Sequence, residues 1–99
     1  MYARLVSFTN ADAENHERAI QTIREIVIPT LREYDGFVGY TALWDQDNHR
    51  AKGIILWDTK EQAEAAEQTL GERRREMASG VGLAIESEDL YEVIITELE

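Results

Sequence analysis

The chain has 99 residues, of which 10 are Lys or Arg and 20 are Asp or Glu, so its formal net charge at pH 7 is −10. Such a charge repels the phosphates of nucleic acids and of anionic lipids, which argues against a nucleic acid or a membrane as a partner. Cysteine is absent, which excludes disulfides, and the lack of any signal-like or membrane-spanning apolar run predicts a single cytoplasmic domain over residues 1–99.

The N-terminal third of the chain predicts a strand followed by a helix. Tyr2–Thr9 is rich in β-branched and aromatic residues, which favours a strand. Asn10 or Asp12 is expected to cap the helix that follows. Pro29 should kink the end of that helix because it has no N–H to donate, and Gly36 should stop it. The apolar stripe of the helix has positions three and four residues apart: Ala13, His16, Ile20, Ile23, Val27 and Leu31.

The middle of the chain predicts a hairpin and the start of a second helix. Phe37–Trp44 and Gly53–Trp57 are apolar segments of strand length, and the polar turn Asp45–Arg50 lies between them. Thr59 and Gln62 then have the spacing of a capping box, which predicts that a helix begins there.

The C-terminal third is less regular in pattern. Gly71 should break or bend the second helix and leave a short extra helix over Glu72–Ala78. Ser79–Asp89 is expected to form a loop, and Leu90–Thr96 to form the last strand. The chain as a whole therefore predicts an α+β fold with the element order βαββαβ.

The distribution of apolar residues in the strands predicts a dimer. Two right-handed strand-helix-strand units in one sheet place both helices on the same face. The strands are nevertheless apolar on both faces; for example, Ile54 and Leu56 alternate with Ile55 and Trp57. Strands of this kind belong to sheets that are covered on both sides. The uncovered face should therefore meet a second copy of the chain by two-fold pairing, which gives a homodimer.

Three segments, LREYDGFVGYTALWD, GIILWDTKEQAEAAE and LYEVI, resemble the dimeric α+β barrel proteins, specifically the antibiotic-biosynthesis-monooxygenase-like group. The resemblance implies a ferredoxin-like sandwich whose open sheet faces pair into a barrel. That group includes cofactor-free oxygenases, haem degraders and proteins without a known activity. The resemblance is therefore informative about the fold and leaves the reaction open.

No cofactor is expected. The haem-degrading members of the superfamily carry a Trp and a His on the second helix, and Lys60–Ala78 contains neither residue. His49 lies in the hairpin turn beside Asp45, Asp47 and Asn48, but turn formation explains those residues better than a metal site does. The protein should therefore be colourless and free of metal.

His16 is the candidate base. It lies on the apolar stripe of the first helix, where a cleft between helix and sheet would open, and an imidazole titrates near neutral pH. The commoner role for such a residue is a boundary histidine that packs one ring edge and faces solvent. Asn10, close to the end of the first strand, is the second candidate catalytic residue, with an orienting role.

Tyr40, Trp44 and Trp57 are candidate walls for a planar ligand, although aromatic residues in strands more often fill the core. The turn permits either register, so the sequence leaves open whether Trp57 shares a face with Tyr40. Arg73 is a candidate for stabilising the charge of a bound enolate or phenolate. In the run Glu-Arg-Arg-Arg-Glu, the commoner role is a solvated helix face.

Two functions follow from these observations. The first is a cofactor-independent monooxygenase that deprotonates a planar aromatic or polyketide-like molecule and lets the carbanion react with oxygen. The alternative is a non-catalytic homodimeric module that binds a small molecule with the same fold. An open cleft with a titratable group inside it favours the enzyme, whereas a pocket filled by side chains favours the module.

Overall fold

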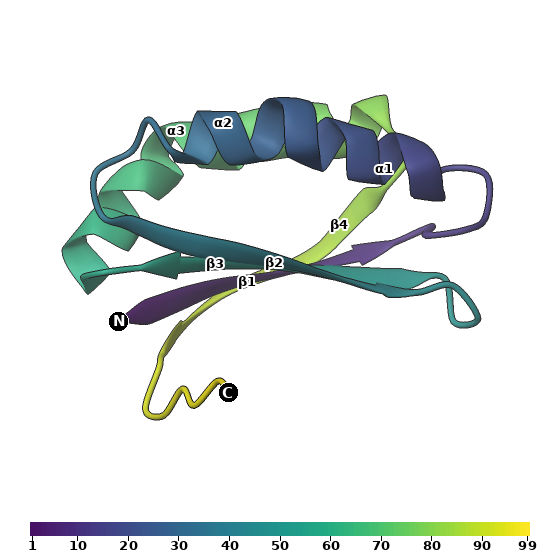
Figure 1. Ribbon diagram of the computed structural model, residues 1–99. Coiled ribbons are helices and arrows are strands. Elements are labelled where there is room, and N and C mark those ends of the chain that lie inside the picture. The colour runs from purple at the N-terminus through teal and green to yellow at the C-terminus, as the bar shows by residue number, and fades with distance from the viewer.

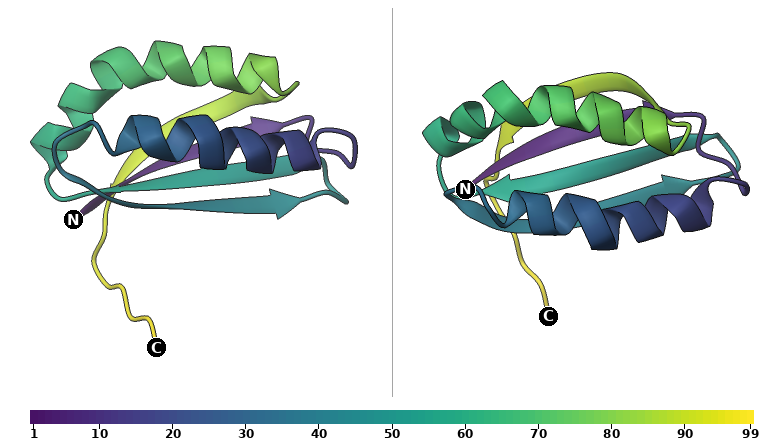
Figure 2. Two further views of the ribbon diagram at one scale, coloured as in Figure 1. Left: turned by 45° about the horizontal axis from the view of Figure 1, so that its top comes forward. Right: turned by 90° about the horizontal axis from the view of Figure 1, so that it is seen from above.

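The computed structural model describes residues 1–99, and it places two layers of helix and sheet against each other (Figure 1). The elements in chain order are β1 (Tyr2–Thr9), α1 (His16–Thr22), the π-helical η1 (Ile23–Val27), α2 (Ile28–Leu31), β2 (Phe37–Asp45), β3 (Arg50–Trp57), α3 (Lys60–Gly80) and β4 (Ala84–Glu92). The four strands pair antiparallel in the order β2-β3-β1-β4, with every helix on one face of the sheet (Figure 2). This is the predicted ferredoxin-like α+β fold. None of the helices has the length and apolar character needed to cross a membrane.

The first helical rod begins later than predicted. Its first residue is His16, with Asn15 at the cap position, whereas the sequence indicated a cap at Asn10 or Asp12. The Asp12 carboxylate instead accepts hydrogen bonds from the backbone N–H groups of Glu14 and Asn15, which makes a turn ahead of the helix. Pro29 lies at the start of α2, and the π-helical turn η1 comes directly before this segment.

The second helix is one continuous element, so Gly71 does not break it, and the separate helix predicted over Glu72–Ala78 is wrong. It begins as predicted, because the Thr59 hydroxyl accepts a hydrogen bond from the Gln62 N–H at 3.1 Å. Gly71 is buried within the helix, and a Cβ at that position would meet the Glu67 carboxylate at 3.4 Å. Tertiary packing therefore outweighs the low helix propensity of a single glycine.

The last strand also differs from the prediction. It spans Ala84–Glu92, so most of the segment predicted as a loop, Ser79–Asp89, is strand. Its partner is β1, with a register shift between Ser7 and Phe8. The remaining residues, Val93–Glu99, form no helix or strand and leave the sheet on the side away from the helices (Figure 1). We call Val93–Glu99 the arm.

The two faces of the sheet are distinguished by β3. Its alternate residues Ala51, Gly53, Ile55 and Trp57 are buried beneath the helices, while the residues between them are more accessible. Register then assigns the neighbouring strands, since Leu5 pairs with Ile54, and Ala3 with Leu56. We call the side away from the helices the open face; its apolar side chains are Ala3, Leu5, Leu43, Ile54, Leu56 and Tyr91.

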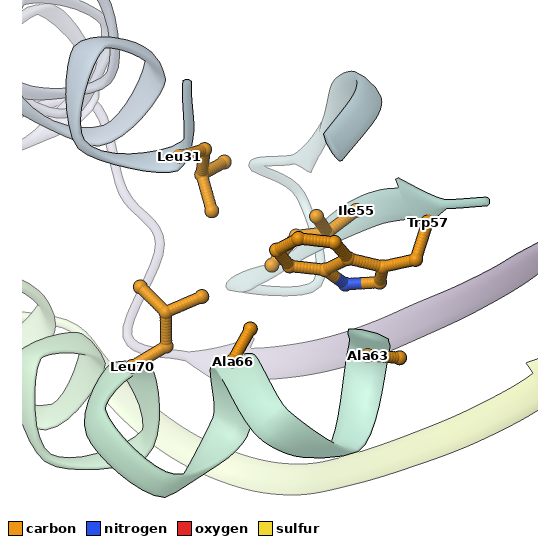
Figure 3. Packing of buried hydrophobic residues seen from close by; sticks show 6 residues of the cluster. All are labelled: Leu31, Ile55, Trp57, Ala63, Ala66 and Leu70. Carbon is orange, nitrogen blue, oxygen red and sulfur yellow. The ribbon is translucent and has the colours of Figure 1, made fainter. Parts of the chain in front are cut away.

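A compact core fills one end of the space between the layers. The Trp57 indole lies over Ala63 and Ala66 of α3 and extends towards Leu31 and Leu70 (Figure 3). Tyr34 and Phe37 contact the Trp57 ring edge-to-face at centroid distances of 6.4 and 6.2 Å. The other end of the same interlayer space is less completely filled.

Candidate functional site

A cavity of about 90 Å³ lies between the helices and the sheet, beyond the Trp57 core. Its wall consists of 22 residues, 17 of them hydrophobic, so its interior suits an apolar ligand. The sheet supplies Val6, Phe8, Tyr40, Ala42, Trp44, Ala51, Gly53 and Ile55, and the helices supply Ala19, Ile23, Val27, Leu31, Leu70, Arg74, Met77 and Ala78. Ala42 lies on the edge strand β2 and is exposed, so the cavity reaches solvent beside that strand.

Tyr40 brings a hydroxyl group into this apolar wall. Tyr40 pairs with Ile55 of β3, and its hydroxyl oxygen lies close to Gly53, two residues away on that strand. A Cβ added at Gly53 would lie 2.8 Å from this oxygen, so only glycine leaves room for the phenol. Burial raises the pKa of Tyr40 above its ordinary value of 10.0, and the charge of Arg74 offsets part of that rise. The phenol is therefore neutral at physiological pH and retains a proton that it can donate to a ligand.

Arg74 is the buried cation of the site. It lines the cavity, and its side chain is only 9% exposed. Its Nη1 donates to Glu67 at 2.7 Å and to Glu88 at 2.9 Å, and its Nη2 donates to the other Glu67 oxygen at 3.0 Å. The Arg4 Nε lies 3.6 Å from Glu67. We call these four residues the ion cluster; its formal charge is balanced, and it holds the guanidinium in a fixed orientation.

The ion cluster also determines the ionisation of Glu67. Partial burial raises the pKa of this carboxyl, but the hydrogen bonds and the positive charge of Arg74 outweigh burial, and the net pKa lies below 4.5. Glu67 is therefore ionised at neutral pH and keeps Arg74 charge-balanced.

His16 and Trp44 form an aromatic pair at the other end of the cavity. Their ring centroids are 5.1 Å apart and the rings meet edge-to-face. Trp44 lines the cavity, and His16 lies behind it at the N-terminus of α1, outside the cavity wall. The Trp44 Nε1 is buried and has no acceptor in the protein.

The structure brings together only some of the site residues predicted from the sequence. Tyr40 and Trp44 share the cavity wall, whereas Trp57 is 1% exposed and is part of the core. Arg73 is exposed on the outer side of α3, and the neighbouring Arg74 takes the inward position. Asn10 is exposed, with a left-handed backbone at φ 67°, and its carbonyl accepts a hydrogen bond from the Asn15 side chain.

Ala63 and Ala66 pack under Trp57 and are not part of the cavity wall. The ion cluster was missed altogether. One signal for Arg74 was present, since it lies four residues after the buried Leu70 on a helix with an Ala-rich inner face. The spacing allowed either Arg73 or Arg74 at this inward position, and the structure places Arg74 there.

Several solved structures share this fold. SnoaB, a cofactor-independent oxygenase from Streptomyces nogalater, aligns with a TM-score of 0.68 and 18% identity over 99% of this chain and 97% of its own. A monooxygenase from Streptomyces coelicolor, solved with the ligand nanaomycin D, aligns with a TM-score of 0.73 and 16% identity over 99% of this chain and 91% of its own. The chain has the fold of these oxygenases.

A dimeric ferredoxin-like protein from an uncultured marine organism aligns over the full length of both chains, with a TM-score of 0.70 and 12% identity. No protein-family model matches the sequence, and a search of the curated proteins finds no match either. At these identities the likeness establishes the ferredoxin-like architecture of the antibiotic-biosynthesis-monooxygenase-like proteins.

Tyr40 gives a testable pH dependence. Above the ordinary tyrosine pKa, the unfolded chain loses the phenolic proton while the folded chain retains it, so the free energy of unfolding should fall as pH rises past 10.0. Tyr40→Phe should show less of this alkaline loss. Urea unfolding of both proteins at about pH 9 and about pH 11 measures the difference. Equal losses in the two proteins would mean that Tyr40 titrates as an exposed tyrosine does.

Proposed function

We propose that this protein is a cofactor-independent oxygenase acting on a planar aromatic or polyketide-like small molecule. The observation that carries the proposal is the apolar cavity whose wall contains the neutral Tyr40 hydroxyl and the fixed Arg74 guanidinium. An apolar space with a few oriented polar groups is typical of sites that bind a small organic molecule. Support from outside the chain comes from the shared fold, since one similar structure is described as a cofactor-independent oxygenase.

The reaction needs a carbon acid as substrate. A base removes a proton from an acidic CH₂ group between aromatic rings, and the electron pair left on carbon reduces O₂ as the carbon–oxygen bond forms. Protonation gives a hydroperoxide, and loss of water from it leaves a ketone. One oxygen atom of O₂ ends in the product and the other in water, and the substrate itself supplies the electrons.

The residues of the cavity have distinct roles in this proposal. Tyr40 donates a hydrogen bond to the substrate oxygen that gains negative charge when the carbon is deprotonated. Arg74 stabilises the same charge through its positive field. Trp44 supplies a flat wall against which a planar substrate stacks.

His16 is the proposed base. No carboxylate and no histidine lines the cavity, and the ionisable residues of its wall are Tyr40, Lys52 and Arg74. His16 contacts Trp44 at 5.1 Å between ring centroids, so it is one side chain away from the bound molecule. A substrate that displaces the Trp44 ring would bring its CH₂ group to the imidazole. Asn10 is exposed at the same end of the sheet and has an orienting role in the proposal.

The volume of the cavity constrains how the substrate binds. About 90 Å³ is below the roughly 300 Å³ at which pockets begin to hold drug-sized ligands. The site must therefore widen for a molecule of several rings. The cavity can widen on the side of the exposed Ala42, because this residue lies on the edge strand β2 and no further strand packs beside it.

Blocking the cavity tests the proposal. The wild-type protein, treated with a chelator, should consume O₂ with an anthrone and yield the corresponding quinone. Ala42→Trp places a large ring at the cavity mouth without disturbing a buried residue and should abolish that consumption. Ala65→Trp, on the exposed side of α3, is the matched control and should retain it. An oxygen electrode and the absorbance of the quinone measure both, and equal rates in the two variants would place the reaction elsewhere.

We also propose a homodimer formed through the open face. Leu43 and Tyr91 of this face are 48% and 54% exposed, and Leu5, Ile54 and Leu56 lie between them in the sheet. Exposed apolar surface of this extent is typical of an interface, and isologous pairing covers it symmetrically. One protein of the same fold is described as dimeric.

The alternative function, a homodimeric ligand-binding module without catalysis, is favoured by one observation. The only histidine near the cavity lies behind Trp44 and does not reach the cavity wall. A module of this kind would bind an anthrone or a quinone, as seen by quenching of Trp44 fluorescence, without consuming O₂.

A further inference from the structure

Met77 brings the only sulfur atom into the wall of the cavity. The chain has no cysteine and two methionines, and the other one, Met1, lies at the N-terminus with 46% of its surface exposed. Met77 is half-buried on α3, three residues after Arg74, and the proposed reaction gives it no chemical role. A thioether sulfur is nevertheless a nucleophile towards peroxides, and the product of that reaction is methionine sulfoxide.

Met77 lies at the same end of the cavity as the proposed base. Both views of Figure 2 show the C-terminal end of α3 and the N-terminal end of α1 at the same end of the molecule. A Cβ added at Gly82, just after α3, would lie 3.6 Å from the side chain of Asn15, which directly precedes His16. Trp44 contacts His16 and lines the cavity together with Met77. The carbon that His16 deprotonates is therefore held at the Met77 end of the cavity.

The hydroperoxide of the proposed reaction forms on that same carbon. Its first course is loss of water to give the ketone. A neighbouring thioether offers a second course, in which a sulfur lone pair attacks the outer peroxide oxygen, the O–O bond breaks and an S–O bond forms. The hydroperoxide proton moves to the alkoxide oxygen that remains, and the product is an alcohol. The peroxide gains two electrons and the sulfur loses two, so no further reductant is needed.

We infer that Met77 is a self-modification site, which is oxidised to the sulfoxide by the hydroperoxide formed in the protein's own turnover. The inference rests on the proposed oxygenase function and goes beyond it. One chain can reduce one hydroperoxide in this way, so the modification stops at one oxygen atom per chain. The sulfoxide then places a polar group in a mostly apolar wall. An apolar substrate fits this wall less well, so the oxidation slows later turnovers and limits the working life of the protein.

Turnover under ¹⁸O₂ tests the inference. The full-length protein is incubated with an anthrone and catalase, and mass spectrometry follows the peptides that contain Met77 and Met1. The Met77 peptide should gain one ¹⁸O atom as quinone accumulates, and its labelling should exceed that of Met1 by about tenfold or more. The activity of Met77→Leu should decline less over successive turnovers than that of the wild type. Quinone formation without label on Met77, or equal labelling of both methionines, would overturn the inference and keep the oxygenase.

A preformed hydroperoxide tests the position of Met77 without any turnover. Cumene hydroperoxide, which carries an aromatic ring, should enter the cavity and oxidise Met77 faster than the more exposed Met1. Ala42→Trp should remove this preference by blocking the cavity mouth, and Ala65→Trp should retain it. Faster oxidation of Met1 in the wild type, alongside O₂ consumption with the anthrone, would reject the inference alone. Absence of O₂ consumption would reject the oxygenase function and, with it, the source of the oxidant.

Discussion

His16→Ala should reduce O₂ consumption with an anthrone by about 100-fold or more and leave the protein folded, because a positioned general base contributes about that factor. The fold should survive because His16 is partly exposed at the first turn of α1 and contacts Trp44 through only one ring edge. Initial rates from an oxygen electrode, together with circular dichroism, measure the two effects separately.

The second histidine provides the control for this experiment. His49 lies in the hairpin turn with a left-handed φ of 55°, so His49→Asn preserves the backbone and should retain full activity. Unchanged activity in His16→Ala would remove His16 from the reaction. If the wild-type protein binds the anthrone but does not consume O₂, the non-catalytic binding module would be the better-supported function.

Arg74→Ala should lower the free energy of unfolding by about 3 kcal/mol or more, because removing one partner of a buried ion pair leaves uncompensated charge. Here two carboxylates, Glu67 and Glu88, lose their shared donor, and Arg4 is the nearest cation that remains. Urea unfolding at neutral pH measures the loss. Arg73→Ala is the matched control on the outside of the same helix and should change stability by less than about 0.5 kcal/mol.

The ion cluster also predicts an acid dependence. The pKa of Glu67 is lowered in the folded protein, so its stabilising contribution is present above the ordinary value of 4.5 and is lost as pH falls through the folded value. Arg74→Ala should lose less stability on acidification than the wild type does. Parallel acid losses in the two proteins would show that Arg74 does not control this titration.

The elements that sequence predicted well are those with local signals. Gly36 adopts φ 86° after the first helical rod, and the Thr59 hydroxyl caps α3, as their residue types indicate. The hairpin could be predicted from two apolar segments and the polar turn between them. These signals depend on neighbours in the chain, so the sequence alone was enough for them.

β4 was mispredicted because its strand character depends on distant residues. Ala-Ile-Glu-Ser-Glu-Asp-Leu contains four charged or polar residues in a row, yet it pairs with β1, where Arg4 lies opposite Leu90 and the bulge lies at Ser7–Phe8. Glu88 there meets Arg74 across the layers. Such partners are visible only in three dimensions, and for the same reason the ion cluster could not be read from the run of three arginines.

The register of the hairpin could also not be predicted from the sequence. A register shift between Phe37 and Gly39 brings both Phe37 and Tyr40 to the helix side, although their positions have opposite parity. The apolar character of β2 at both parities, which indicated two covered faces, is therefore partly the result of this bulge. The exposed Leu43 and Tyr91 remain as independent support for a covered open face.

The π-helical turn η1 determines the direction in which His16 points relative to the core. A π turn holds one residue more than an α turn, so it rotates everything N-terminal to it by about 100° relative to an uninterrupted α-helix. His16 lies N-terminal to η1, and Leu31, which anchors the rod in the core, lies C-terminal to it. A substitution that converted η1 to a regular α turn without removing a residue would therefore keep Leu31 in place and turn the imidazole away from Trp44, whereas a deletion at Arg24 would preserve the direction of both side chains. The direction in which the base points is therefore set by the one extra residue of η1, separately from the packing of Leu31 in the core.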